Sequence, residues 1–242
     1  MTHEKRFLDY TLLALSVVLG VGSIILLVVL GSLTFTRFGW SDPEILLWDT
    51  FLSLLFFLQH SVMVRRAFKQ RLSRVVPPLY HGAIYTIASG LVLAALVIFW
   101  QKSATGVYVL QGIARWVLYA SALFAAFIFL LSIHALRTFD PLGIGPIRAR
   151  LRGVEPHAGP FVVRGPYRWV RHPLYACVLV LFWSAPVVTL DRLLFNVLWT
   201  AWVYVATLFE ERDLTREFGE VYTEYKKKVP MFVPWRGAAS DA

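Results

Sequence analysis

The sequence predicts an all-α, polytopic membrane protein: a bundle of about six transmembrane helices, with both termini cytoplasmic and an amphipathic helix near the C-terminus. Hydrophobic residues make up 57% of the 242 residues, and the mean hydropathy is +0.61, more than a soluble core requires. The apolar residues gather in blocks close to bilayer length, and within lipid only helices satisfy their own backbone in such blocks. Lysine and arginine concentrate between alternate blocks, which indicates a fixed orientation in the membrane.

Six nearly continuous apolar segments qualify as spans. The last two are short and are separated only by Asp191 and Arg192, which predicts a tight helical hairpin. Short spans are tolerated where neighbouring helices cover them. The predicted spans are residues 12–35, 45–64, 79–100, 113–136, 174–190 and 193–209.

The first ten residues are polar and include Lys5 and Arg6. The apolar run behind them has no evident small-residue cleavage site and is too long for the hydrophobic region of a signal peptide. We therefore interpret it as a retained span. Its glycines and serines suit close helix packing and leave room for a dimer.

The basic residues determine the orientation. All 24 except Arg37, Lys102, Arg115 and Arg192 fall on one side of the six predicted spans, the side that also holds both termini. The positive-inside rule makes that side cytoplasmic. The net charge of +9 therefore reflects topology and contact with anionic lipid, and no soluble basic domain exists that would favour nucleic-acid binding.

Polar residues gather near the cytoplasmic ends of the second to fourth spans. Gln59 and His60 lie about one turn inside the second span, where polar side chains usually face protein or a water-filled cavity. Their position is compatible with a pocket for substrate or proton handling, or with a histidine hydrogen-bonded at the membrane interface. Tyr85 lies a turn inside the third span. For His81 the interfacial interpretation is favoured.

No metal site is predicted. His60, His81 and His134 belong to one cytoplasmic layer, but no two of them share a helix at ligand spacing, and no carboxylate is fixed beside them. The single cysteine, Cys177, excludes an internal disulfide and a cysteine-based metal cage.

Residues 137–163 form the only long polar connection, and it leads into the fifth span. Pro173 fits the first turn of that helix, whose free N–H groups and positive dipole end favour a carboxylate. Arg171 adds a fixed charge, and Tyr167 and Tyr175 offer aromatic faces to a cationic or heteroaromatic ligand. By spacing alone, an interfacial belt explains the segment equally well.

The sixth span ends in Glu210 and Glu211, acids that run against the positive charge of the cytoplasmic side. The chain beyond them predicts an amphipathic helix that folds over the cytoplasmic mouth and ends in three lysines. The alternative is a helix that lies on the membrane surface. Its predicted apolar face contains Leu214, Phe218, Val221, Tyr222, Tyr225 and Val229.

Ordered motifs near the C-terminus carry a family resemblance. Residues 165–175 read GPYRWVRHPLY and are followed by Glu210-Glu211, Phe218-Gly219, Tyr222, Tyr225 and Val229-Pro230. Over about residues 160–235, the chain resembles the integral-membrane methyltransferases of the isoprenylcysteine carboxyl methyltransferase and phospholipid methyltransferase superfamily. The upstream residues Gln59–Met63, Phe68-Lys69 and Pro77-Pro78 are similar to the bacterial methanethiol S-methyltransferase branch. In one departure, Cys177 replaces the glycine that usually follows the motif tyrosine by two residues.

The resemblance implies that S-adenosyl-L-methionine is the cofactor, held between the last two spans and the C-terminal segment. Arg171 and the helix N-terminus would suit its carboxylate, whereas Glu210 and Glu211 would suit its ammonium group or ribose. The implied cofactor-binding residues are Tyr167, Arg171, His172, Pro173, Tyr175, Glu210, Glu211, Tyr222 and Tyr225.

The implied reaction is a direct SN2 displacement that methylates a small thiol or another lipophilic nucleophile. It needs in-line approach and a nucleophile in the correct protonation state. His60 could favour an ionised thiol. We therefore predict His60 and Arg171 as catalytic residues and Gln59, His60 and Tyr85 as substrate-binding residues.

We expect one integral-membrane domain in the bacterial inner membrane, with residues 1–136 on the substrate side and residues 137–242 on the cofactor side. The expected partners are the cofactor, a methyl acceptor and membrane lipid. Alternative acceptors are an isoprenylcysteine carboxylate and a phospholipid amine. The non-enzymatic alternatives are a membrane carrier and a scaffold.

Overall fold

The structure is a computed structural model that describes residues 3–29, 34–136, 140–155 and 161–238. Residues 30–33 of the first predicted span and Arg137 at the start of the polar connection lie outside the described residues. The chain forms two compact units. Unit 1 contains Met1–Ser103 and Asp140–Ala158, and unit 2 contains Ala104–Phe139 and Gly159–Ala242.

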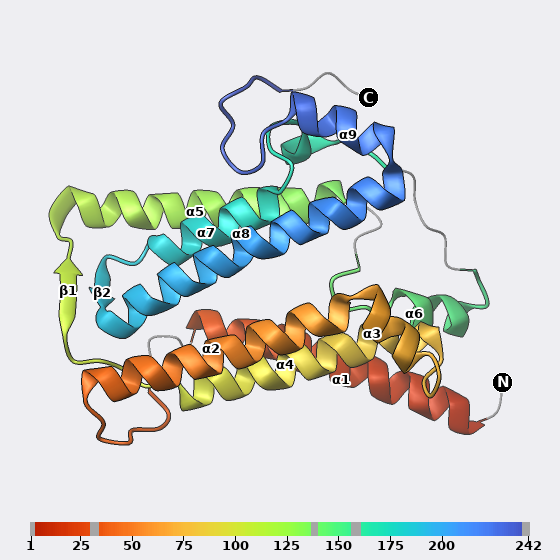
Figure 1. Ribbon diagram of the computed structural model, residues 1–242, viewed down its shortest axis with the longest axis horizontal. Coiled ribbons are helices and arrows are strands. Elements are labelled where there is room, and N and C mark those ends of the chain that lie inside the picture. The colour runs from red at the N-terminus through yellow and green to blue at the C-terminus, as the bar shows by residue number, and fades with distance from the viewer. Residues whose placement is uncertain (1–2, 30–33, 137–139, 156–160, 239–242) are drawn as a thin grey trace. The chain divides into compact units, whose positions relative to one another are not determined.

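Unit 1 is a small helical bundle in which α4 packs against both α1 and α2 (Figure 1). Pro77 precedes a short 3₁₀ turn, Pro78–Tyr80, that leads directly into α4. The helices of this unit are α1 (His3–Val29), α2 (Asp42–Val64), α3 (Arg66–Leu72), α4 (His81–Phe99) and α6 (Gly145–Arg152).

A buried acid joins three parts of unit 1. Asp9 of α1 is fully buried and accepts a hydrogen bond from the Tyr80 hydroxyl at 2.9 Å. The Nη2 atom of Arg150, in α6, lies 2.5 Å from both Asp9 oxygens, and this hydrogen bonding raises the pKa of the guanidinium. Because a buried carboxylate is retained only when it is paired, this contact fixes α6 against α1 and the turn before α4.

Unit 2 contains the remaining spans and a two-stranded sheet. Helix α5 packs along α7, and α7 packs on α8. The fourth predicted span, α5, thus belongs to the same compact unit as the C-terminal segments and not to that of the first three spans. The elements are β1 (Gly106–Val109), α5 (Gly112–Ala135), a 3₁₀ turn (Gly165–Arg168), α7 (Pro173–Trp183), β2 (Val187–Thr189), α8 (Leu190–Phe218) and α9 (Glu220–Lys228).

The described helices confirm the predicted all-α membrane architecture. Five of them are long and apolar enough to cross a membrane: α1, α2, α4 with its preceding turn, α5 and α8. Apolar side chains such as Ile113, Leu123 and Leu130 remain largely exposed along α5, as expected for a helix whose outer face meets lipid.

The fifth predicted span, residues 174–190, differs from the structure. Helix α7 is 11 residues long and ends at Trp183, and β2 pairs with β1 in antiparallel register, with Tyr108 opposite Val188. Pro186 lacks the N–H that a continuing helix needs, and the β-branched residues behind it favour a strand. The predicted hairpin turn at Asp191 and Arg192 is therefore wrong, because both residues lie in the first turn of α8.

Helix α8 continues nine residues beyond the predicted end of the sixth span and stops where Gly219 adopts a φ of 59°. The predicted amphipathic helix follows as α9. Its residues Tyr222 and Tyr225 are buried in a cluster with Val163 and Val229. Val221, predicted on the same face, is instead 60% exposed, because it lies about 100° around the helix from Tyr222.

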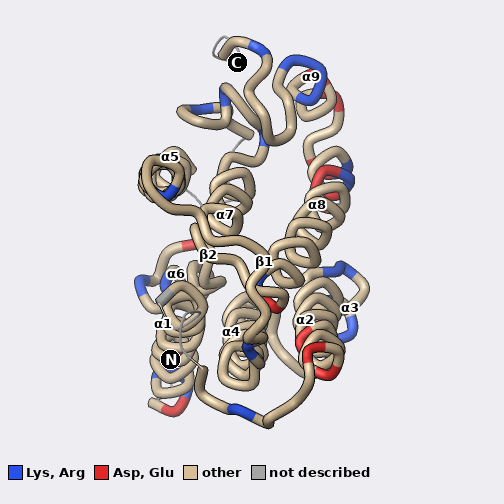
Figure 2. The backbone as a smooth tube through the Cα atoms, turned by 90° about the vertical axis from the view of Figure 1, so that its left-hand side faces the viewer, with Lys and Arg blue, Asp and Glu red and all other residues tan. Residues whose placement is uncertain are grey.

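The charged residues of each unit are concentrated in particular elements. Figure 2 shows lysine and arginine along α3 in unit 1 and at the end of α9 in unit 2. Helix α9 ends with Lys226, Lys227 and Lys228, where positive charge complements the C-terminal end of the helix dipole.

Candidate functional site

The site in unit 2 is built on the turn that leads into α7. Gly165 has a φ of 54°, in the left-handed region that glycine adopts at no steric cost. It opens the 3₁₀ turn Gly165–Arg168. His172 is the N-cap of α7 and Pro173 is its first residue, as the sequence predicts. These local constraints place Arg171 and His172 together at the start of the helix.

Glu211 is the centre of a buried charge cluster. Its Oε1 accepts hydrogen bonds from Arg171 Nε at 2.7 Å and from His172 Nε2 at 3.1 Å. Its Oε2 lies 3.1 Å from the Lys226 ammonium. Glu211 and His172 are buried, and the Arg171 side chain is 9% exposed. A buried carboxylate with three donors is well compensated. The cluster joins the two residues that precede α7 to α8 and α9.

Arg171 also holds the end of α9. Its Nη1 donates to the carbonyl oxygens of Lys226 at 3.1 Å and Val229 at 2.5 Å. Helix C-termini leave such carbonyls unpaired, and a cation there is favourable. The backbone N–H groups of Arg171 and His172 donate to Pro230 and Met231. The segment after α9 is thereby bound to the start of α7.

Glu210 faces a different partner from its neighbour. The hydroxyl of Tyr175, in the first turn of α7, donates to Glu210 Oε2 at 2.7 Å. The rings of Tyr175 and His172 stack with centroids 5.7 Å apart and planes 8° from parallel. The two adjacent acids therefore occupy separate environments, Glu211 within the buried charge cluster and Glu210 beside an aromatic pair.

The aromatic residues predicted to cap the cofactor lie in the cluster under α9. Tyr225 donates from its hydroxyl to the Tyr167 carbonyl at 2.6 Å. Tyr222 is 1% exposed, and its hydroxyl has no hydrogen-bond partner of normal geometry among the described residues. Burial raises the pKa of Tyr167, Tyr222 and Tyr225, and the charge of Glu211 raises that of Tyr222 further. All three are therefore neutral phenols at physiological pH.

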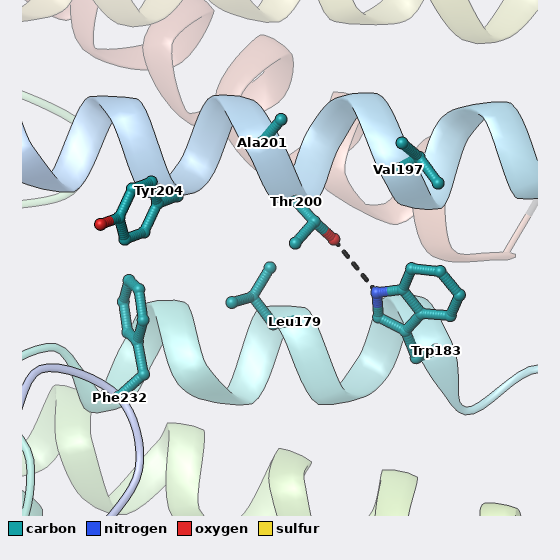
Figure 3. A pocket seen from close by; sticks show the side chains of 7 residues that line it. All are labelled: Leu179, Trp183, Val197, Thr200, Ala201, Tyr204 and Phe232. Carbon is teal, nitrogen blue, oxygen red and sulfur yellow. Dashed lines mark hydrogen bonds between the residues drawn. The ribbon is translucent and has the colours of Figure 1, made fainter.

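An apolar groove lies between α7 and α8 (Figure 3). Its volume is about 440 Å³. Tyr204 and Phe232 flank one end, and at the other the Trp183 Nε1 donates to Thr200 at 3.1 Å. The Phe232 ring also lies edge-on to His172, with centroids 6.2 Å apart. The lining residues are Leu179, Trp183, Val197, Thr200, Ala201, Tyr204 and Phe232.

The residues predicted on the substrate side come together in unit 1. The Tyr85 hydroxyl of α4 lies 2.6 Å from His60 Nε2 of α2, and the His60 ring also contacts Phe56 at a centroid distance of 5.2 Å. Gln59 donates to Ser89 Oγ at 3.2 Å. The polar pair is thus held between two spans in partly apolar surroundings.

His81, another histidine of the predicted cytoplasmic layer, has surroundings of its own. His81 Nε2 lies 3.0 Å from the Val76 carbonyl. In the ranges that the structure describes, no three His, Cys, Asp or Glu side chains are grouped so that they could hold a metal ion.

Two contacts were missed from the sequence. Lys226 pairs with Glu211, and its position one helical turn after Tyr222 is a signal that could have placed it on the inward face. The pairing of Asp9 with Arg150 joins residues 141 positions apart, and no local sequence pattern predicts such a contact.

Comparisons with known proteins identify a matching family and several relatives. The family description "Phospholipid methyltransferase" matches residues 154–221. Methanethiol S-methyltransferase 2 of Bradyrhizobium diazoefficiens is 38% identical, over 79% of this chain and 74% of its own. Methanethiol S-methyltransferase of Mycobacterium tuberculosis is 33% identical over 75% of each chain. Nurim of Xenopus laevis is 28% identical, over 76% of this chain and 66% of its own. No solved structure matches the chain.

Proposed function

Because the chain belongs to the methanethiol S-methyltransferase family and is an integral-membrane methyltransferase, we propose that it methylates a small thiol with S-adenosylmethionine as the donor. The observation that carries the proposal is the Glu211 cluster, in which Arg171, His172 and Lys226 converge on one buried carboxylate. This cluster lies within the segment that the family resemblance assigns to the cofactor.

The described residues fit the chemical groups of S-adenosylmethionine. The donor carries a carboxylate, an ammonium group, ribose hydroxyls and an adenine ring, and the site offers cations, carboxylates and aromatic faces. The buried Tyr222 hydroxyl, which has no hydrogen-bond partner of normal geometry among the described residues, is a polar atom that a ligand could satisfy. When bound, S-adenosylmethionine supplies a methyl group on a positively charged sulfur.

We assign separate roles to the residues of unit 2. Lys226, with a side chain that is 38% exposed, and the positive dipole end at the start of α7 would hold the carboxylate. Glu210, oriented by Tyr175, would hold the ammonium group or the ribose. Arg171 is a positioning residue in this proposal, because its Nε and Nη1 atoms already bind Glu211 and the end of α9.

We place the acceptor side at His60, Tyr85 and Gln59. A direct SN2 displacement asks the protein mainly for orientation and for a deprotonated thiol. His60 is suited to accept the thiol proton at a ring nitrogen. The Tyr85 hydroxyl, 2.6 Å from His60 Nε2, orients the imidazole. The apolar neighbour Phe56 suits a small, lipophilic thiol.

The orientation follows from the charge distribution, and we propose that the chain lies in the bacterial cytoplasmic membrane with both termini in the cytoplasm. The methyltransferases that it matches include several from bacteria. Access of the donor from the cytoplasm then requires no transport step.

Two experiments test the proposal. Isothermal titration calorimetry of the purified protein with S-adenosylhomocysteine should give saturable binding. Membranes incubated with labelled S-adenosylmethionine should transfer label to methanethiol in preference to prenylcysteine analogues and amino-lipids. Labelling of a prenylcysteine carboxylate or a lipid amine in place of the thiol would show that the acceptor belongs to one of the alternative classes. Absence of both binding and transfer would favour a scaffold.

A further inference from the structure

An aromatic cluster surrounds the start of α2 in unit 1, far along the helix from His60. The rings of Phe38 and Trp40 have centroids 4.6 Å apart, and those of Trp40 and Trp48 have centroids 5.7 Å apart. Gly39, between Phe38 and Trp40, has a φ of 71°, which lets the chain turn without a steric penalty. The planes of Trp40 and Trp48 meet at 78°, so the two indoles form adjoining walls.

These walls border an open hollow of about 570 Å³ that also contains a carboxylate. The Glu44 Oε2 accepts hydrogen bonds from the Ser41 backbone N–H at 2.8 Å and from its hydroxyl at 2.6 Å. The Trp48 Nε1 donates to the Phe99 carbonyl at 3.0 Å. The acid and one indole are thus held in place before any ligand arrives. The lining residues are Trp40, Glu44, Leu47, Trp48 and Phe51.

The position in the span indicates what meets this hollow. The opposite end of α2 leads into Arg65 and the basic helix α3, on the side assigned to the cytoplasm. The hollow therefore lies at the opposite membrane surface. Leu47 is 73% exposed and Phe51 55% exposed, one and two turns further into the span. The hollow is accordingly continuous with a lipid-facing apolar surface.

We propose that this hollow binds the alkylammonium headgroup of a zwitterionic phospholipid. Faces of indole and phenyl rings attract cations, and perpendicular aromatic walls are the usual enclosure for alkylammonium groups. Glu44 supplies the opposite charge. Leu47 and Phe51 provide a surface for the acyl chain of the same lipid, which favours a phospholipid over a soluble ammonium compound.

An ordinary interfacial aromatic belt accounts for tryptophans at this depth. Ser41 and Glu44 form the capping box of α2, which explains why the carboxylate is fixed. A belt, however, does not require a negative charge at the border of the rings. An aromatic belt should bind zwitterionic and anionic lipids with similar affinity, whereas a hollow with an acid at its border should bind anionic phosphatidylglycerol less tightly. This difference makes the two explanations separable.

Native mass spectrometry of the purified full chain, with equal amounts of phosphatidylethanolamine and phosphatidylglycerol of the same acyl chains, tests the proposal. The wild type should retain phosphatidylethanolamine with a preference of about threefold to tenfold, because exposed cation–π contacts are modest. Trp40→Leu and Glu44→Gln should bring the ratio close to one. Trp116→Leu is the matched control, because Trp116 is exposed on another span.

Each variant should elute as one species and keep its affinity for S-adenosylhomocysteine, which separates loss of the lipid site from loss of the fold. Tetramethylammonium chloride should compete with phosphatidylethanolamine on the wild type. Equal retention of the two lipids by the wild type would overturn the proposal. A preference that persists in both Trp40→Leu and Glu44→Gln would also overturn it. Binding of tetramethylammonium without any lipid preference would replace the lipid by a soluble ammonium ligand.

Discussion

Arg171 donates from Nε to Glu211 Oε1 at 2.7 Å, and both side chains are more than nine-tenths buried. The ion pair joins the segment just before α7 to α8, and the same guanidinium binds carbonyls at the C-terminal end of α9. One ion pair thus fixes three elements of the proposed donor site, so the stability of the unit and binding at the site are coupled.

Glu211→Ala should lower the free energy of unfolding by about 3–5 kcal/mol, because it leaves the Arg171 guanidinium buried and uncompensated. Thermal unfolding in detergent measures the loss. The control is Asp213→Ala, which removes an exposed pair with Arg216 at 3.5 Å and should change stability by less than about 1 kcal/mol.

The double variant Arg171→Met/Glu211→Leu distinguishes stability from binding. It should recover much of the lost stability, since apolar replacement of a whole buried ion pair is tolerated. It should still bind S-adenosylhomocysteine poorly, because His172 and Lys226 lose their shared partner. A double variant with wild-type affinity would show that this cluster is structural only.

Tyr175→Phe should weaken S-adenosylhomocysteine binding by about tenfold or more, since a hydrogen bond to a charged group is worth about 1.5–3 kcal/mol. The substitution removes the hydroxyl that donates a hydrogen bond to Glu210 Oε2 at 2.7 Å and so orients this carboxylate. Glu210→Ala and His172→Ala should abolish binding, whereas His81→Ala should leave it intact. Calorimetry checks all four variants, and unchanged affinity in Glu210→Ala would place the donor elsewhere.

His60→Ala should slow methylation of a thiol at neutral pH by about 10²-fold, the usual contribution of a general base. Its affinity for S-adenosylhomocysteine should stay unchanged. As the pH rises towards the pKa of the thiol, the acceptor ionises without help, so the ratio of wild-type to variant rate should fall. A ratio that is constant with pH would contradict a role in removing the proton.

Gly82→Ala should lower the free energy of unfolding by about 1–3 kcal/mol, the usual cost of overpacking. A Cβ at this position would lie 2.6 Å from the Gly143 carbonyl oxygen and 2.7 Å from its Cα. Backbone atoms cannot move aside as a side chain can. Gly22→Ala in α1, where a Cβ meets nothing within 4 Å, should be neutral or slightly stabilising. Equal effects on thermal unfolding would refute the close contact.

Asn196→Leu should raise the free energy of unfolding by about 1–3 kcal/mol, the cost of an unsatisfied buried polar group. Asn196 is fully buried, and neither atom of its amide has a hydrogen-bond partner in the part of the chain that the structure describes. Thr207→Val, which removes a buried hydroxyl bonded to the Val203 carbonyl at 2.8 Å, should instead be slightly destabilising. Destabilisation by Asn196→Leu would contradict the prediction and would mean that overpacking by the larger side chain, or loss of a bound partner such as an internal water, outweighs the gain.

Local sequence patterns predicted which segments are helical better than they predicted where each helix begins and ends. The apolar blocks identified the helices α1, α2, α4, α5 and α8 because hydropathy over bilayer length is a property of contiguous sequence. Hydropathy also merged α7 and β2 into one predicted span, because both segments are apolar. Only pairing with β1, some 80 residues earlier, makes residues 187–189 a strand.

The candidate site shows the same division. The membrane class followed from the sequence alone, as did the grouping of acids, arginine and aromatics near the ends of the last spans. The side that holds most of the positive charge stays a prediction. Only the folded structure shows that Glu211 binds Arg171, His172 and Lys226 while Glu210 binds Tyr175. Hydropathy and charge sum along the chain, whereas the partner of one carboxylate depends on the rotation and depth of neighbouring helices, which only packing fixes.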